Sequence, residues 1–121
     1  MIIRNCAGGI VFFEDSVLLI SNEKHEWFFP KGAVRIGQKE REVALSRVSI
    51  EAGVEATLLA PCGKTNYEFY SVTRQKPIHN NISWFIMKAS DNKATPNKEE
   101  GFTDGGFFPL EVAMEKVTYS Q

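Results

Sequence analysis

The sequence predicts an α/β (α+β) fold, in which helices cover the faces of a mixed β-sheet. The chain has 121 residues, of which 43% are hydrophobic, so it is long enough to bury one shared core. Strand-like segments lie on both sides of one long helix-like segment, and a second, shorter helix-like segment follows the last strand. No repeat or linker interrupts this pattern, so we expect a single domain over residues 1–121.

The first part of the chain is expected to form two strands and a structured loop. Residues 2–13 are dominated by Ile, Val and Phe, and the polar residues 14–16 turn the chain into a second apolar run at 17–20. Residues 27–32 read Trp-Phe-Phe-Pro-Lys-Gly, where aromatic rings must pack while Pro and Gly impose an irregular path. We expect a loop there.

The main helix is expected over residues 39–52, which contain neither Gly nor Pro. Gly53 should end this helix as a C-terminal cap, whereas Lys39 is a poor N-cap residue. Four apolar residues fall on one stripe at helical spacing: Ala44, Leu45, Val48 and Ala52.

The second half of the chain is expected to return to strands. The Pro-Cys-Gly segment at 61–63 and a polar turn at 73–77 should separate three of them, of which the last two form a hairpin. A polar loop at 90–100 precedes the final strand, and a brief helix at 110–116 follows it. The predicted strands are residues 54–60, 64–72, 78–89 and 102–108.

Charge and composition argue against several classes of protein. Fourteen basic and fifteen acidic residues give a net charge of -1, so no chain-wide positive field attracts nucleic acid or an anionic membrane. No apolar run approaches the roughly 18 residues of a membrane span, and Arg4 interrupts the apolar N-terminus where a signal peptide would be continuous. Cys6 and Cys62 show neither zinc-site nor disulfide-framework spacing. We expect a cytoplasmic protein with no nucleic-acid or membrane partner.

The segment from Gly32 to Val54 resembles a known catalytic motif. Its pattern, Gly-x5-Gln-x7-Ser-Arg-Val-Ser-Ile-Glu-Ala-Gly-Val, aligns without a gap with the Nudix box, G-x5-E-x7-R-E-U-x-E-E-x-G-U, where U is aliphatic. Residues 27–32 are similar to the W-x-F-P-K-G segment of diadenosine tetraphosphate and diphosphoinositol phosphate hydrolases, which belong to this MutT-like family. Residues 7–12 and 106–113 are similar to its first strand and closing segment. The resemblance implies a Nudix-type α/β/α sandwich.

The box departs from the family pattern at the positions that carry its chemistry. Family glutamates hold magnesium, which neutralises phosphate charge and orients water. Here Gln38, Arg47 and Ile50 replace three of them, Ser46 replaces a supporting arginine, and Glu51 remains. At helical spacing, Arg47 repels a dication and pairs with Glu51 across one turn. We therefore predict that hydrolysis is weak or lost; Mg2+ is the cofactor if the chain is active.

Other residues are candidates for binding a ligand. Lys31 resembles the family lysine that faces substrate phosphate, and Gly32 permits close approach of the backbone. Arg4 is a second candidate for a phosphate contact, and Tyr67 is a candidate for stacking on a base. The alternatives are a solvated loop lysine, a surface arginine and a core tyrosine.

Glu99 and Glu100 lie in a loop where related enzymes often place a further glutamate that binds metal or activates water. With Glu51, one of them would make a reduced one-metal catalytic site. The alternative is that the loop glutamates are solvated, and that Glu51 is a helix-surface carboxylate paired with Arg47. The two histidines lack partners at ligand spacing and receive no role.

Three functions are consistent with the sequence. The first is a hydrolase of nucleoside diphosphates linked to another group, dinucleoside polyphosphates among them, and the second is a non-catalytic module that binds a nucleotide or other phosphorylated small molecule. The third is an interaction protein that meets a partner or a second copy through an apolar surface around Ile50, although packing is the simpler expectation for that residue. Family members continue with a longer closing helix, whereas this chain stops at residue 121, so a homodimer is expected as one way to cover that face.

Overall fold

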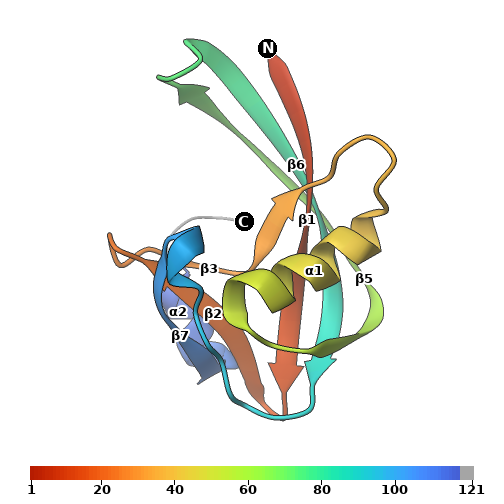
Figure 1. Ribbon diagram of the computed structural model, residues 1–121, viewed down its shortest axis with the longest axis vertical. Helices are drawn as coiled ribbons and strands as arrows, with labels where there is room; N and C mark the ends of the chain where they lie inside the picture. Colours follow the sequence, from red (N-terminus) through yellow and green to blue (C-terminus); the bar gives the residue numbers. More distant parts are fainter. Residues whose placement is uncertain (118–121) are drawn as a thin grey trace.

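The computed structural model describes residues 1–117, and its centre is a set of three long strands (Figure 1). Strand β1 (Ile2–Phe13) pairs in parallel with β6 (Lys76–Ala89), and β6 pairs antiparallel with β5 (Ala56–Ser71) as the predicted hairpin. Residues 118–121, and with them the expectation about a shortened closing segment, lie outside the described residues.

The other edge of β1 is shared by two strands. Strand β2 (Ser16–Asn22) pairs with the C-terminal end of β1, and β4 (Lys31–Ala33) pairs with its middle. Strand β2 also pairs with β3 (Trp27–Phe28) and with β7 (Phe102–Pro109). The seven-stranded sheet is therefore mixed, as predicted.

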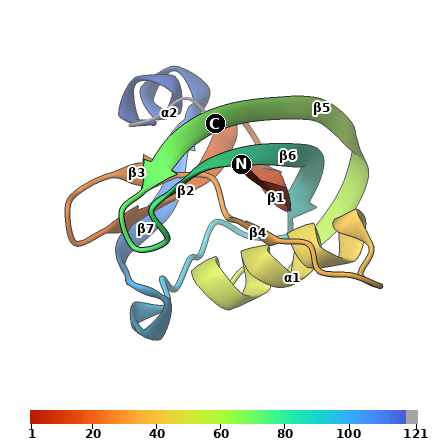
Figure 2. The ribbon, with the colours of Figure 1, turned by 90° about the horizontal axis from the view of Figure 1, so that it is seen from above.

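The two helices lie on opposite faces of the sheet (Figure 2). Successive residues of a strand point to opposite faces, so β2 contributes side chains to both layers. Leu18 belongs to the cluster under α1 (Glu40–Ala52), whereas Leu19 packs in a cluster with Ala113 of α2 (Leu110–Lys116). The predicted α/β/α sandwich is confirmed. Neither helix of the described part is long and apolar enough to cross a membrane.

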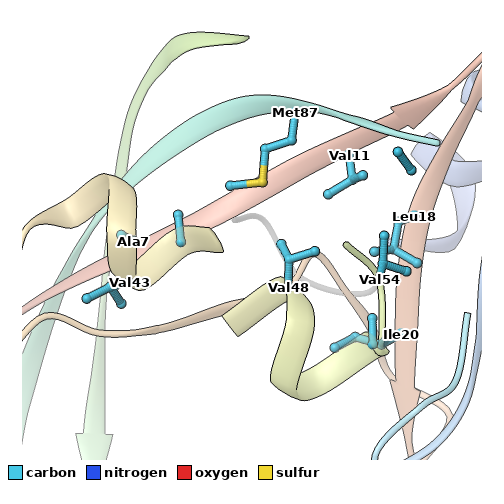
Figure 3. Close-up of a cluster of buried hydrophobic side chains, with 11 residues drawn as sticks. Ala7, Val11, Leu18, Ile20, Val43, Val48, Val54 and Met87 are labelled. Carbon is cyan, nitrogen blue, oxygen red and sulfur yellow. The ribbon is translucent and has the colours of Figure 1, made fainter. Parts of the chain in front are cut away.

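The main core lies between α1 and the sheet (Figure 3). Complete burial of a Val, Leu or Ile side chain contributes about 1.5–3 kcal/mol, so this layer fixes α1 on the sheet. Leu45, expected on the buried stripe, is only partly buried, and Val43 is buried in its place. The buried members are Ala7, Val11, Leu18, Ile20, Val43, Ala44, Val48, Ala52, Val54, Met87 and Ala89.

Both ends of α1 follow the expectations from sequence. Gly53 adopts the left-handed conformation, with φ 65°, and its N–H donates to the carbonyl of Ser49. Lys39 occupies the N-cap position without a side-chain capping hydrogen bond. The short helix α2 also spans the predicted residues.

Two predictions about strands are wrong. Residues 61–63 do not separate two strands, because β5 runs through them with register shifts between Leu58 and Ala60 and between Pro61 and Gly63. An edge strand tolerates such bulges and a proline, which a central strand does not. Residues 27–32 are not only a loop, since they contain β3 and the start of β4.

Candidate functional site

Arg47 lies between two carboxylates from distant parts of the chain. Its Nη2 atom is 2.6 Å from Oε2 of Glu51, one turn along α1, and 2.6 Å from Oε1 of Glu100 in the 3₁₀ helix η1 (Lys98–Glu100). Its Nε atom also donates to Oε2 of Glu51 at 3.3 Å. The predicted pair of Arg47 and Glu51 is present, and Glu100 joins it.

Asn97 holds η1 beside the C-terminal end of α1. Its backbone N–H donates to the carbonyl of Glu51 at 3.0 Å, and its Nδ2 donates to the carbonyl of Ile50 at 2.9 Å. Its Oδ1 accepts a hydrogen bond from the N–H of Glu99, as the N-cap of η1. The last carbonyls of an α-helix lack partners within the helix, so Asn97 satisfies two of them and keeps η1 within reach of Arg47.

Strand β4 brings Lys31 and Gly32 to this cluster. The N–H of Lys31 donates to Oε1 of Glu51 at 3.2 Å, and its Nζ lies 5.5 Å from the centroid of the Phe28 ring. A Cβ atom added to Gly32 would lie 2.6 Å from both Cγ and Cδ of Arg47. Residue 32 must therefore lack a side chain for Arg47 to reach the carboxylates.

Glu51 is buried, so the expectation of a helix-surface carboxylate is wrong. Only 6% of the residue is exposed. Burial raises the pKa of the Glu51 carboxyl, and the hydrogen bonds and charges of Arg47 and Lys31 oppose that shift. For Arg47, burial disfavours the charged form, but Glu51 and Glu100 outweigh it and raise the pKa of the guanidinium. The buried carboxyl thus has a permanent cation beside it.

The two carboxylates line a cavity of about 330 Å³. Besides Glu51 and Glu100, its wall contains Lys31, Phe28 and Phe29. The cavity therefore offers a lysine, acidic oxygens and aromatic surface to one small ligand.

Ile50 is exposed, contrary to the expectation that it packs inside the fold. It is 43% exposed and lines a second cavity of about 560 Å³ between α1 and residues 32–38, with Gly32, Gln38 and Arg47 in the same wall. Arg47 thus lines this second cavity, whereas its two acidic partners line the first.

Arg4 and Tyr67 belong to a polar row that crosses β1, β6 and β5. Asn80 is the register partner of both. Arg4 Nε donates to Asn80 Oδ1 at 3.0 Å, and Asn80 Nδ2 donates to the Tyr67 hydroxyl at 2.9 Å. The rings of Tyr67 and Phe69 stack with centroids 6.0 Å apart, and the guanidinium of Arg4 lies 5.8 Å from the Phe69 centroid. Asn80 has no local sequence signal, because only the strand register shows that this buried amide joins Arg4 to Tyr67.

Lys31 and Arg4 lie on the same face of the sheet, on either side of Cys6. Gly8 is the partner of Lys31 in the pairing of β1 with β4, and residues 4, 6 and 8 point to one side of β1. Burial raises the pKa of the Cys6 thiol, and the charges of Arg4 and Lys31 oppose the shift. Two cations and the Tyr67 ring therefore lie on one face of the sheet.

Glu99 is not brought to the cluster with its neighbour. Its N–H donates to Asn97, but within residues 1–117 its carboxylate forms no ion pair, whereas that of Glu100 contacts Arg47. Of the two loop glutamates predicted as metal ligands, the structure places Glu100 beside Glu51.

As arranged, these carboxylates fit a guanidinium and not Mg2+. Magnesium requires near-octahedral oxygen ligands. One oxygen of Glu51 and one of Glu100 already bind Nη2 of Arg47, whose fixed charge repels a dication. Nowhere in the described part of the chain do three or more Asp, Glu, His or Cys side chains form a group that could hold a metal.

A family model described as NUDIX domain matches residues 3–120. The MutT4 protein of Mycobacterium tuberculosis (strain CDC 1551 / Oshkosh) is 29% identical over 62 residues, which are 51% of this chain and 24% of that protein. The matched part thus spans about a quarter of the length of this relative.

Solved structures resemble the chain along nearly its whole length. The dihydroneopterin triphosphate pyrophosphohydrolase of E. coli superposes with a TM-score of 0.77 at 16% identity, covering 99% of this chain and 90% of that one. An Ap4A hydrolase of C. elegans superposes with a TM-score of 0.68 at 18% identity, covering 97% and 88%. At these identities the likeness concerns the fold.

Proposed function

The chain belongs to the NUDIX domain family, and from this premise we propose that it binds a nucleotide or a related phosphorylated small molecule, with magnesium-dependent hydrolysis weak or absent. The observation that carries the proposal is the contact of Arg47 with Glu51 and Glu100, at 2.6 Å each. A guanidinium stays protonated at every working pH, so it competes with Mg2+ for both carboxylates. Catalysis that needs a carboxylate-held metal is therefore suppressed, while the fold and the ligand surface remain.

The surface that carries Lys31, Arg4 and Tyr67 supports binding of such a ligand. Lysine and arginine donate charge-assisted hydrogen bonds to phosphate oxygens, and a tyrosine ring offers a face on which a base stacks. Two structural relatives, the Ap4A hydrolase and the dihydroneopterin triphosphate pyrophosphohydrolase, have names that specify polyphosphate compounds. We infer that the ligand carries a phosphate chain at Lys31 and a base near Tyr67, dinucleoside polyphosphates included.

A hydrolysis assay tests the proposal that magnesium-dependent catalysis is suppressed. Diadenosine tetraphosphate and nucleoside triphosphates are incubated with Mg2+ and the native chain, Glu51→Gln, or Arg47→Glu/Ile50→Glu. We expect no turnover by the native chain and turnover by the double variant, because it offers new carboxylates next to Glu51. Arg41→Glu, exposed on the same helix, makes the same Arg-to-Glu change away from Glu51 and should stay inactive.

Calorimetric titration tests the binding role. With the same nucleotides and excess EDTA, the native chain should bind, and Lys31→Ala or Arg4→Ala should weaken binding by about tenfold, as expected for loss of one charge-assisted contact. Lys24→Ala, exposed in the turn after β2, removes an equal charge and should leave the affinity unchanged. Binding that requires Mg2+ would contradict the proposal.

A second candidate is a hydrolase with a reduced, one-metal site. It is favoured by the convergence of Glu51 and Glu100 on a single atom, since movement of Arg47 would leave two carboxylates facing one position. Native turnover that disappears in Glu51→Gln would select this candidate. Absence of both turnover and nucleotide binding would leave the interaction protein.

A further inference from the structure

We propose that the outer half of β5 is a self-association surface, on which the β5 strand of a second copy of this chain pairs antiparallel about Asn66. The sheet order β3-β2-β1-β6-β5 leaves β5 at an edge, with β6 as its partner on one side. An edge strand presents unpaired N–H and C=O groups, which can bind another strand.

The two halves of β5 differ in how well they could receive another strand. The first half contains Pro61 and register shifts on both sides of it, which protect an edge against pairing. Residues 64–71 pair with β6 one to one, without a shift, and contain neither Pro nor Gly. The outer half therefore has the regular geometry that strand addition needs.

This half also carries exposed aromatic surface. Tyr70 is 61% exposed and Phe69 is 39% exposed, and Val72, just after the strand, is 81% exposed. Figure 1 shows this end of the hairpin projecting away from both helices. A regular, partly apolar edge whose outer side pairs with no strand of the described chain is the kind that associates.

The charges of residues 64–71 favour a second copy of this chain as the partner and favour one strand register. Lys64 and Glu68 are the charged residues within 64–71. A two-fold axis at Asn66 places Lys64 of each copy opposite Glu68 of the other, on the same face of the joined sheet. Directly opposed charges of opposite sign stabilise a strand pair, and an axis at Lys64 or Glu68 would oppose like charges. The segment is thus complementary to itself in one register.

Glu68 can accept this contact without losing its present one. Its Oε1 atom lies 3.0 Å from Nδ1 of His79 in the neighbouring strand, and its side chain is 56% exposed. The second carboxylate oxygen remains accessible to a lysine from the other copy. The ion pair across the axis therefore adds to the existing contact.

Sedimentation equilibrium of charge variants tests the register. The native chain should dimerise, and Lys64→Glu or Glu68→Lys should each weaken the dimer about tenfold, because two favourable pairs become two repulsions. The exchange Lys64→Glu/Glu68→Lys should restore native affinity. Lys24→Glu, exposed elsewhere, should change nothing.

Disulfide cross-linking tests the axis independently. In a Cys62→Ser background, Asn66→Cys places one thiol of each copy opposite the other, so mild oxidation should produce a covalent dimer. Asn92→Cys, exposed in the loop after β6, should cross-link far more slowly. A native chain that stays monomeric up to about millimolar concentration, or an exchange variant no tighter than the single variants, would overturn the proposal.

Discussion

Arg47 and Glu100 are 53 positions apart in the sequence, yet Nη2 of the arginine lies 2.6 Å from Oε1 of the glutamate. The same nitrogen contacts Glu51, so one guanidinium joins helix α1 to the loop that precedes β7. The cation compensates a buried carboxylate that would otherwise be costly, and it does so without a metal. The stability of this region and the proposed suppression of metal-dependent hydrolysis thus depend on the same side chain.

Removal of Arg47 should destabilise the fold. We expect Arg47→Ala to lower the free energy of unfolding by about 2–3 kcal/mol, because Glu51 stays buried and loses its charged partner. Urea unfolding followed by circular dichroism measures the change. Arg41→Ala, exposed on the same helix, should cost no more than about 0.5 kcal/mol, and an equal cost for both variants would contradict the assigned role.

The same variant should become sensitive to magnesium. Without the guanidinium, the carboxylates of Glu51 and Glu100 both face the position that it occupied, and Mg2+ can bind there. A cation that binds only the folded chain stabilises that chain. Millimolar Mg2+ should therefore raise the melting temperature of Arg47→Ala and not that of the native chain. Arg47→Ala/Glu51→Gln is the control, and an equal rise in that variant would show that Mg2+ binds elsewhere.

Local features of this chain could be predicted because covalent geometry determines them. The pair of Arg47 and Glu51 follows from helical spacing, and the end of α1 at Gly53 follows from the left-handed conformation that glycine tolerates. The continuous apolar run at residues 17–20 of β2 also predicts a strand with two buried faces.

Features that depend on distant contacts could not be predicted. The family resemblance predicts a loop glutamate near Glu51, but no local pattern shows that Asn97 ties η1 to the end of α1 or that Glu100 reaches Arg47. Asn80 joins Arg4 to Tyr67 through the register of three strands, which the sequence does not specify. The structure therefore adds mainly pairings between distant segments to the site.

Gly32 should be coupled energetically to Arg47. A methyl group at residue 32 would collide with Cγ and Cδ of that side chain, so Gly32→Ala should displace it and cost about 1–2 kcal/mol of unfolding free energy. In an Arg47→Ala background the same change should cost much less, because the colliding atoms are absent. A double-mutant cycle in urea measures the coupling, and additive costs would mean that Gly32 matters for another reason.

The pH dependence of stability should report the burial of Glu51. Burial raises the pKa of this carboxyl above its ordinary value of 4.5, with Arg47 and Lys31 opposing the shift. The folded chain then binds more protons than the unfolded chain between the two pKa values, so the contribution of Glu51 to stability is complete below the unfolded pKa and declines as pH rises through the folded pKa. The unfolding free energy of the native chain minus that of Glu51→Gln, which cannot titrate, should fall as pH rises and then level off.

Glu42→Gln, exposed on the same helix, measures the loss of one carboxylate without burial. A difference that grows with pH would mean that the guanidinium outweighs burial at this site.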